Sequence, residues 1–314
     1  MDTTYEPDGT DRTDGTDRAD SGPYHPGSRA VQDRVGVREL ADHVGRSIGP
    51  GIRPVAAAFL ELQPMLVIGA ADPVGGRVWA SLLTGEPGFV RATGPSQMSV
   101  AGGPAEGDPL AAALAVPGTP VGTIALDPRT RRRMRLNGRA RPTPRGLAVE
   151  ADQVFANCPK YLQQRRLLGA RPPEARPRTT RGTDLTPAQR DFVAAADTFF
   201  LATVREGGAD AGHRGGNPGF VRVVSPRELE WPDYPGNAMF LTLGNLTRDP
   251  RAGLLFLDWT TGTALHLTGT ARTAFAPDGT RTVRLALTET RETTAASPWT
   301  WSAPAYSPAN PPLR

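Results

Sequence analysis

The residues best suited to chemistry lie in the stretch HRGGNPGFVRV, which begins at His213. His213 and Arg214 would supply positive charge to a phosphate group, and Gly215 and Gly216 would let backbone N–H groups approach that group closely. The plainer interpretation is that the paired glycines form a turn and that the histidine is structural. The residues alone favour the functional and the structural interpretation of His213 about equally. The secondary structure around the stretch is therefore needed to choose between them.

Part of this stretch occurs twice, because PGFVR begins at position 87 and again at position 218, which are 131 residues apart. The same separation relates LDPRT at 126 to LDWTT at 257, and NGRA at 137 to TGTA at 268. A constant offset over about fifty residues indicates a tandem duplication. We therefore predict two copies of one helix-plus-β unit, covering about 54–150 and 186–275, that pack as a pseudo-symmetric pair.

Alternating polarity within the copies predicts strands. In RRRMRLNGRA, Met134 and Leu136 fall opposite Arg133 and Arg135, which is the period of a half-buried strand. The run RRRMR is therefore interpreted as the solvent-exposed face of a strand rather than as a nucleic-acid-binding patch.

The polar, glycine-rich residues belong to the second copy alone. Shared residues can be explained by the common fold, so function is expected where the copies differ. At the offset of 131, Tyr234, Gly236, Asn237, Gly244 and Asn245 correspond to Gly103, Ala105, Glu106, Ala113 and Leu114.

Flanking segments predict further elements. The segment AVQDRVGVRELADHVGRSI has apolar residues at helical spacing and predicts an amphipathic helix, although Gly36 and Gly45 weaken that prediction. PVAAAFLELQ predicts a short helix before a strand, VWASLL predicts a strand, and the region 87–150 has the pattern of antiparallel β structure. A helix is also predicted over NCPKYLQQRRLL, with Asn157 as its N-cap.

Composition divides the chain into four parts. The segment 169–185 is rich in Pro, Gly and charge and is predicted to be a linker. Thr186, Pro187 and Gln189 then form a capping-box signature that begins a new helix. The predicted organisation is a disordered tail at 1–23, a first unit at 24–168, the linker, and a second unit at 186–314.

Charge and composition exclude several classes of function. The net charge of +4 on 314 residues is weak evidence for nucleic-acid binding. Cys158 is the single cysteine, which excludes an intramolecular disulfide, and the four histidines show no metal-ligand spacing. Neither a signal peptide nor a membrane-spanning run is recognisable, so a cytoplasmic protein is expected.

Five segments together resemble a known family: HRGGNPGFVRV, PDYPGN, TLGNL, DPRAGLLFLDW and FANCPKYLQQR. They are similar to the pyridoxamine 5'-phosphate oxidase-like family of flavin-binding split β-barrels, in its large two-unit actinobacterial form. The resemblance runs from about Tyr24 to near Pro312. It implies a mostly β fold, a tandem-duplicated FMN-binding split barrel with flanking helices. It is poorly specific for a reaction, because this fold hosts oxidases, reductases, haem-handling proteins and flavin binders.

The resemblance implies FMN as the cofactor, bound by the second unit in a site whose walls are partly formed by the first unit. FMN needs phosphate donors, a flat apolar slot and donors near its ring carbonyls. Asn237 and Asn245, with their neighbouring glycines, would add donors at a turn and a helix start, where an anion is favoured. The expected cofactor-binding residues are His213, Arg214, Gly215, Gly216, Arg222, Tyr234, Gly236, Asn237, Gly244, Asn245, Trp79 and Ser81.

Plainer interpretations remain for part of this set. Arg222 corresponds to Arg91 in the first copy, so a shared structural role is slightly favoured. Tyr234 could be a core aromatic, and Trp79 could equally be core or one wall of the flavin slot. The family often has a basic residue where this chain has Ala238, which shifts phosphate binding toward Arg214 and leaves a deazaflavin open as the cofactor.

The function expected from these observations is a flavin-dependent oxidoreductase that passes electrons between a reduced nicotinamide, NAD(P)H, and a small organic acceptor. The alternative is a non-catalytic flavin or haem binding protein of the same fold. No catalytic acid or base can be assigned. The expected partner is a small-molecule substrate, without nucleic acid or membrane, and the expected state is a monomeric pseudo-dimer or a homodimer.

Overall fold

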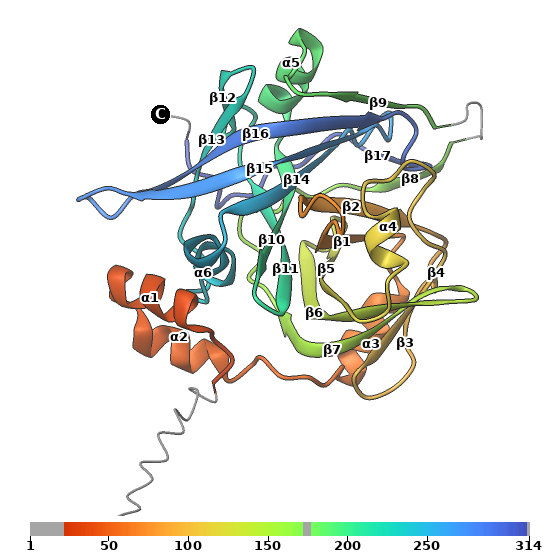
Figure 1. Ribbon diagram of the computed structural model, residues 1–314, viewed down its shortest axis with the longest axis horizontal. Coiled ribbons are helices and arrows are strands. Elements are labelled where there is room, and N and C mark those ends of the chain that lie inside the picture. Colours follow the sequence, from red (N-terminus) through yellow and green to blue (C-terminus); the bar gives the residue numbers. More distant parts are fainter. Residues whose placement is uncertain (1–21, 172–176, 313–314) are drawn as a thin grey trace, which may run out of the picture.

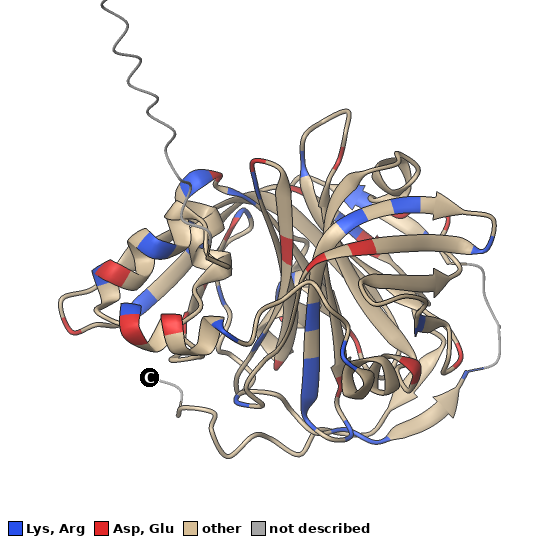
Figure 2. Cartoon of the chain, turned by 90° about the horizontal axis from the view of Figure 1, so that it is seen from below, with Lys and Arg blue, Asp and Glu red and all other residues tan. Residues whose placement is uncertain are grey.

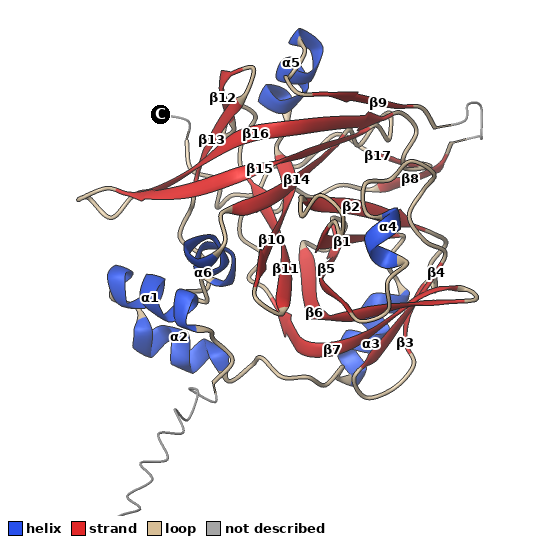
Figure 3. Ribbon diagram, in the orientation of Figure 1, coloured by secondary structure: helices blue, strands red, loops and turns tan. Residues whose placement is uncertain are grey.

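The computed structural model describes residues 22–171 and 177–312, and it is built mostly from strands (Figures 1 and 3). The predicted disordered tail lies almost entirely outside the described residues. None of the described helices is long and apolar enough to span a membrane.

The first unit is one antiparallel sheet with the strand order β2-β1-β5-β6-β7-β4-β3. The second unit repeats this pattern as β11-β10-β14-β15-β16-β13-β12. The first unit comprises α3 (Pro54–Glu61), β1 (Met65–Ala71), β2 (Val78–Thr84), β3 (Val90–Ala92), β4 (Gln97–Ala101), α4 (Ala111–Leu114), β5 (Thr119–Asp127), β6 (Arg132–Thr143) and β7 (Gly146–Ala156). The second comprises α5 (Pro187–Ala195), β10 (Thr198–Arg205), β11 (Gly208–Gly215), β12 (Arg222–Ser225), β13 (Glu228–Pro232), α6 (Leu241–Arg248), β14 (Arg251–Leu257), β15 (Ala264–Phe275) and β16 (Arg281–Thr293).

The equivalent strand orders confirm the duplication predicted from the sequence. The register supports it independently, because β6 carries an irregularity between Asn137 and Gly138 and β15 carries one between Thr268 and Gly269. These positions are again 131 residues apart. The fold class is therefore a tandem-duplicated, mostly β barrel, as expected.

The two units pack closely around a pseudo-twofold relation. Glycines make this approach necessary: a Cβ on Gly122 of β5 would lie 2.3 Å from the backbone nitrogen of Ala211, and a Cβ on Gly253 of β14 would lie 2.6 Å from Cα of Trp79. Each barrel has its own apolar core, and a third cluster that includes Val67, Phe200 and other β1, β2, β10 and β11 residues fills the interface. The chain thus has the architecture of a dimer within one polypeptide.

The N-terminal helical region is two helices rather than one. α1 (Pro26–Val35) ends where Gly36 adopts a left-handed conformation with φ of 72°, and α2 (Arg38–Gly45) follows. α1 lies against α6 of the second unit (Figure 1). Their contact is so close that a Cβ on Gly244 would lie 2.5 Å from the backbone of Ser28. An N-terminal helix therefore fixes the position of α6.

The helix predicted over residues 157–168 is wrong, because this segment has only a turn at 160–161, an isolated β-bridge from Gln164 to Ala305 and the start of a strand at Leu167. Tyr161 has a φ of 64°, and Gln163 is buried. The Gln163 amide donates to the carbonyl groups of Tyr161, Asp197 and Gly216. Tertiary hydrogen bonds between the two units thus replace those of a helix.

The predicted linker is partly ordered in sheets. β8 (Leu167–Ala170) pairs with β17 (Trp299–Trp301), and β9 (Thr179–Gly182) pairs with β16. The helix predicted after it is confirmed as α5, with the complete capping box of Thr186 and Gln189. The division into domains stays a prediction.

Candidate functional site

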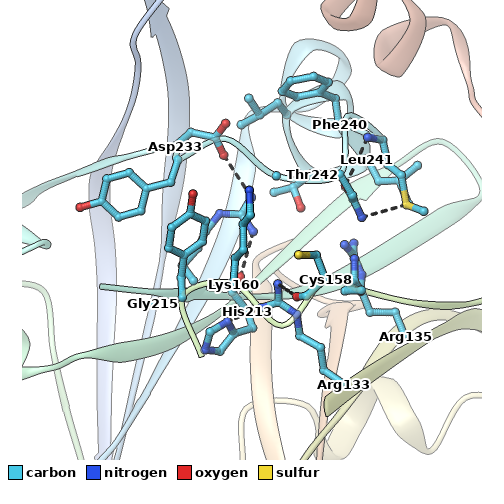
Figure 4. Close-up of a pocket in the computed structure, with 18 of the residues that line it drawn as sticks. Arg133, Arg135, Cys158, Lys160, His213, Gly215, Asp233, Phe240, Leu241 and Thr242 are labelled. Carbon is cyan, nitrogen blue, oxygen red and sulfur yellow. Dashed lines mark hydrogen bonds and ion pairs between the residues drawn. The ribbon is translucent and has the colours of Figure 1, made fainter. Parts of the chain in front are cut away.

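A cavity of about 110 Å³ lies between the two units, next to the start of α6. Strand β6 and residues 157–161 of the first unit form one wall, and β11, the loop 232–240 and the start of α6 form the other. Figure 4 shows Arg133 and Arg135 on one side, with Asp233, Phe240 and Thr242 on the opposite side. The site is therefore composite, and neither unit forms it alone.

The start of α6 faces this cavity without a side-chain cap. Its N-cap residue Phe240 makes no side-chain capping hydrogen bond, although the first N–H groups of a helix have no partner within it. Ala238 and Phe240 have φ of 60° and 51°, a conformation that is costly for residues other than glycine. The Asn237 side chain braces the loop by accepting from the Met239 N–H. A strained loop thus presents a helix N-terminus, which favours an anion.

The first unit contributes two arginines to the lining of this cavity. Arg133 donates to Nδ1 of His213 at 2.5 Å and to the Cys158 carbonyl at 2.7 Å. Arg135 forms a buried ion pair with Asp210 of β11. Within the described residues, the Nε atoms of Arg133, Arg135 and Arg214 are buried without a hydrogen-bond partner. Three guanidinium groups therefore retain donors that the protein itself does not satisfy.

The cavity lining has more basic than acidic side chains. Over the described residues, basic and acidic side chains are interspersed (Figure 2), whereas the described cavity lining has four basic side chains, Arg133, Arg135, Lys160 and Arg214, and one carboxylate, that of Asp233. Asp233 is shared, at 2.9 Å from Arg281 and 3.7 Å from Arg214.

The pKa values of the arginines reflect this excess of charge. Burial lowers the pKa of Arg133 to about 10, with a further contribution from Arg214. Burial, followed by the charges of Arg214 and Arg133, also holds the pKa of Arg135 well below its usual value. Arg133 remains charged near neutral pH, and the burial of its charge costs stability that a bound anion would offset.

His213 is neutral and has a defined tautomer. Burial and the nearby charges of Arg133 and Arg214 hold its pKa well below 6.5. Because a guanidinium can only donate, Nδ1 of His213 must accept from Arg133, and the proton is on Nε2. Nε2 has no partner among the described residues. His213 is thus poised to donate one hydrogen bond to an acceptor on a ligand.

This state of His213 predicts a pH dependence of stability. The unfolded chain takes up the imidazole proton below about pH 6.5, whereas the lowered pKa keeps His213 neutral to lower pH in the folded chain, so this residue should lower the free energy of unfolding as the pH falls from 7 to 5. His213→Gln should lose less stability than wild type over this range, measured by urea unfolding at both pH values. His43→Gln, on exposed α2, should behave as wild type. Equal losses in wild type and His213→Gln would show that the folded chain protonates His213 normally.

The equivalent position on the other side of the pseudo-twofold has a different set of residues. At the 131-residue offset, Leu82 and Leu83 replace His213 and Arg214, and Ala264 and His266 replace Arg133 and Arg135. The Asp108 carboxylate accepts from Ser81 Oγ at 2.7 Å and from the N–H of Leu110, the N-cap of α4, at 2.8 Å. An internal carboxylate therefore lies next to the start of α4, whereas the start of α6 lines a cavity.

The structure brings together half of the residues expected from the sequence. Six line the cavity: His213, Arg214, Gly215, Tyr234, Gly236 and Asn237. Gly216 lies beside them, its carbonyl accepting from Gln163.

The other five lie elsewhere. Arg222 pairs with Glu230 and its side chain is 66% exposed. Gly244 packs against α1, and Asn245 donates to Thr203 Oγ1 at 3.0 Å within the second unit. Trp79 is fully buried in the first barrel, and Ser81 is bonded to Asp108.

The expectation that RRRMR is a solvent-exposed face is wrong, since Arg135 is only 7% exposed and Arg133 lines the cavity. The second unit covers the outer face of β6, which a single-strand pattern cannot show. A signal was nevertheless present, because neither Arg133 nor Arg135 has an arginine as its counterpart in the second copy. The sequence also gave no indication that Tyr161 contacts Tyr234, with ring centroids 5.1 Å apart.

Comparison with known proteins identifies the family. Residues 185–306 match the family model described as pyridoxamine 5'-phosphate oxidase. The C-terminal unit of this chain belongs to the pyridoxamine 5'-phosphate oxidase-like family. The first unit has the same strand order, so it shares the fold.

Solved structures give weaker matches. The FAD binding protein from Mycobacterium smegmatis is 15% identical, with 37% of this chain and 98% of that chain covered, at a TM-score of 0.26. The FAD and haem binding protein from the same organism is 14% identical, with 43% and 88% covered, at 0.27. A FAD-binding protein from Mesorhizobium loti is 12% identical, with 38% and 99% covered, at 0.26. No curated protein matches the chain.

Among the described residues, no group of three or more His, Cys, Asp or Glu could hold a metal ion.

Proposed function

We propose that this chain binds FMN at the cavity between its units and is a flavin-dependent oxidoreductase that passes electrons between a reduced nicotinamide and a small organic acceptor. The observation that carries the proposal is the start of α6, which has no side-chain cap and faces three arginines whose buried Nε donors have no partner among the described residues. This combination suits a phosphate group.

The residues present fit the anionic end of FMN. Arg214 and Arg133 would hold the phosphate together with the first N–H groups of α6, and His213 would donate from Nε2. Bound FMN would supply hydride and single-electron chemistry through its ring system. The cavity volume of about 110 Å³ suits a phosphate group, whereas a whole cofactor needs roughly 300–1,000 Å³, so the ring must extend beyond it.

Two observations bear on the alternatives. Haem binding through His213 is disfavoured, because Nδ1 is occupied by Arg133 and Nε2 carries the proton, leaving no free lone pair for iron. A non-catalytic flavin carrier is favoured by one observation: Asp233, the single carboxylate among the described lining residues, is held by Arg281 and Arg214. The lining therefore offers no unpaired carboxylate for acid–base work.

The absorption spectrum and its response to a reductant test these alternatives. FMN-loaded protein should show a flavin band that bleaches when NADH or NADPH is added without oxygen. A band that neither nucleotide bleaches would support the flavin carrier, and a Soret band would support haem. A deazaflavin would absorb at shorter wavelength than a flavin. Protein that stays colourless with added FMN would contradict the proposal.

A further inference from the structure

A second, larger cavity of about 700 Å³ lies close to the first. It is bounded by the segments flanking α1 and α2, by the hairpin that joins β10 to β11, and by β6 and β7. Its lining is polar and includes His25, Asn137, Asp152 and Glu206. The oxygen Oδ1 of Asn137 is buried there without a partner within the described residues.

The same elements form both cavities. Arg133 and Arg135 of β6 line the first, and Asn137 and Arg139 of the same strand line the second. Leu241, at the start of α6, lines both. The two cavities are therefore successive parts of the interface between the units.

Asp210 lies at the division between them. It is 2% exposed and lines the second cavity, and it forms an ion pair with Arg135, which lines the first. The same carboxylate accepts from Asn137 Nδ2 at 3.1 Å and from Thr242 Oγ1 at 3.2 Å. Asp210 thus connects β6, β11 and α6 across the interface.

Of the residues that Asp210 connects, Arg135 has the least complete set of interactions. Asp210 is its ion-pair partner, it lies over the Phe155 ring at 5.0 Å, and its Nε has no partner among the described residues. It also faces Arg133 and Arg214, whose charges oppose its own. An anion bound at the start of α6 would compete directly with Asp210 for this guanidinium, and Asp210 would keep Thr242 and Asn137 as donors.

We propose that Asp210 is a competing carboxylate: it holds Arg135 in the ligand-free chain, the anionic group of the ligand takes Arg135 from it, and the two cavities then form one groove that accommodates a ligand larger than phosphate. The inference rests on the anion-binding part of the proposed function and not on flavin chemistry. Asp210 accordingly weakens anion binding and limits it to ligands that can displace it.

Inorganic phosphate is the probe that isolates this step. Asp210→Asn keeps the shape of the side chain and one acceptor oxygen but removes its charge, so the competition for Arg135 is removed. Phosphate should bind about three- to tenfold tighter to Asp210→Asn than to wild type in calorimetric titrations at fixed ionic strength. Asp152→Asn is the matched control: it changes the net charge equally and lines the second cavity, and phosphate affinity should stay at the wild-type value. Unchanged or weaker phosphate binding by folded Asp210→Asn overturns the inference.

A measurement on the wild-type chain covers the case in which Asp210→Asn does not fold. Saturating phosphate should speed amide hydrogen exchange in residues 205–210, because Asp210 loses its ion pair. Unchanged exchange there, with phosphate demonstrably bound, overturns the inference. A wild-type chain that binds phosphate but not FMN would instead overturn the proposed function while leaving this inference intact.

Discussion

Replacing Arg133 with Met is expected to stabilise the ligand-free chain while weakening FMN binding. Arg133 is a largely buried cation that pairs with no carboxylate in the described part of the chain, and its neighbours include Arg214. Replacing a poorly compensated buried charge with an apolar side chain of similar length should raise the free energy of unfolding by about 1 kcal/mol or more. Losing its bond to the phosphate should cost about 1.5–3 kcal/mol, or one to two decades of affinity. Urea unfolding and FMN titration measure the two effects.

Arg165→Met is the matched control for this prediction. Arg165 is also buried, but it pairs with Asp197 at 2.6 Å and is not part of the cavity lining. Its loss leaves an unpaired buried carboxylate and should lower stability by about 3–5 kcal/mol. If Arg133→Met destabilises the chain as much as Arg165→Met does, Arg133 is part of the scaffold and the account of the site is wrong.

Arg214→Ala should weaken FMN binding by one to two decades, because it removes a charge-assisted hydrogen bond worth about 1.5–3 kcal/mol. The melting temperature of the apoprotein should hardly change. Asp233 keeps its closer partner Arg281 at 2.9 Å, and the first copy has Leu83 at the equivalent position, so the fold does not require Arg.

The control for Arg214 comes from the first copy. Arg91 is exposed and its Nε donates to the Gly88 carbonyl, so Arg91→Ala should leave FMN affinity unchanged. Titrations of both variants and thermal scans of their apoproteins give the comparison. Equal FMN affinity in wild type and Arg214→Ala would show that the HRGG stretch is scaffold.

The duplicated fold could be predicted from the sequence because its evidence is local and repeated. The offset of 131 residues reappears as equal strand orders and as equivalent irregularities at Gly138 and Gly269. The capping box at Thr186 is likewise a local signal, and the helix formed where it predicted.

The composite nature of the site could not be predicted in the same way. Arg133 and Arg135 alternate with apolar residues, and that pattern is the same whether the outer face of β6 meets water or a second barrel. Tyr161 and Gln163 have helix-compatible neighbours, yet contacts with the second unit hold them in an irregular segment. Gly244 resembles a cofactor contact in sequence, whereas in the structure its missing Cβ lets α1 approach α6.

Titrating FMN into the ligand-free wild-type chain tests the central claim most directly. At the equivalent position Leu82 and Leu83 replace His213 and Arg214, and Asp108 adds a carboxylate nearby, so we expect FMN to bind only at the composite site beside α6. The account predicts saturation at one FMN per chain, detected by the change in flavin absorption. Saturation at two FMN per chain, or no binding at all, would contradict it.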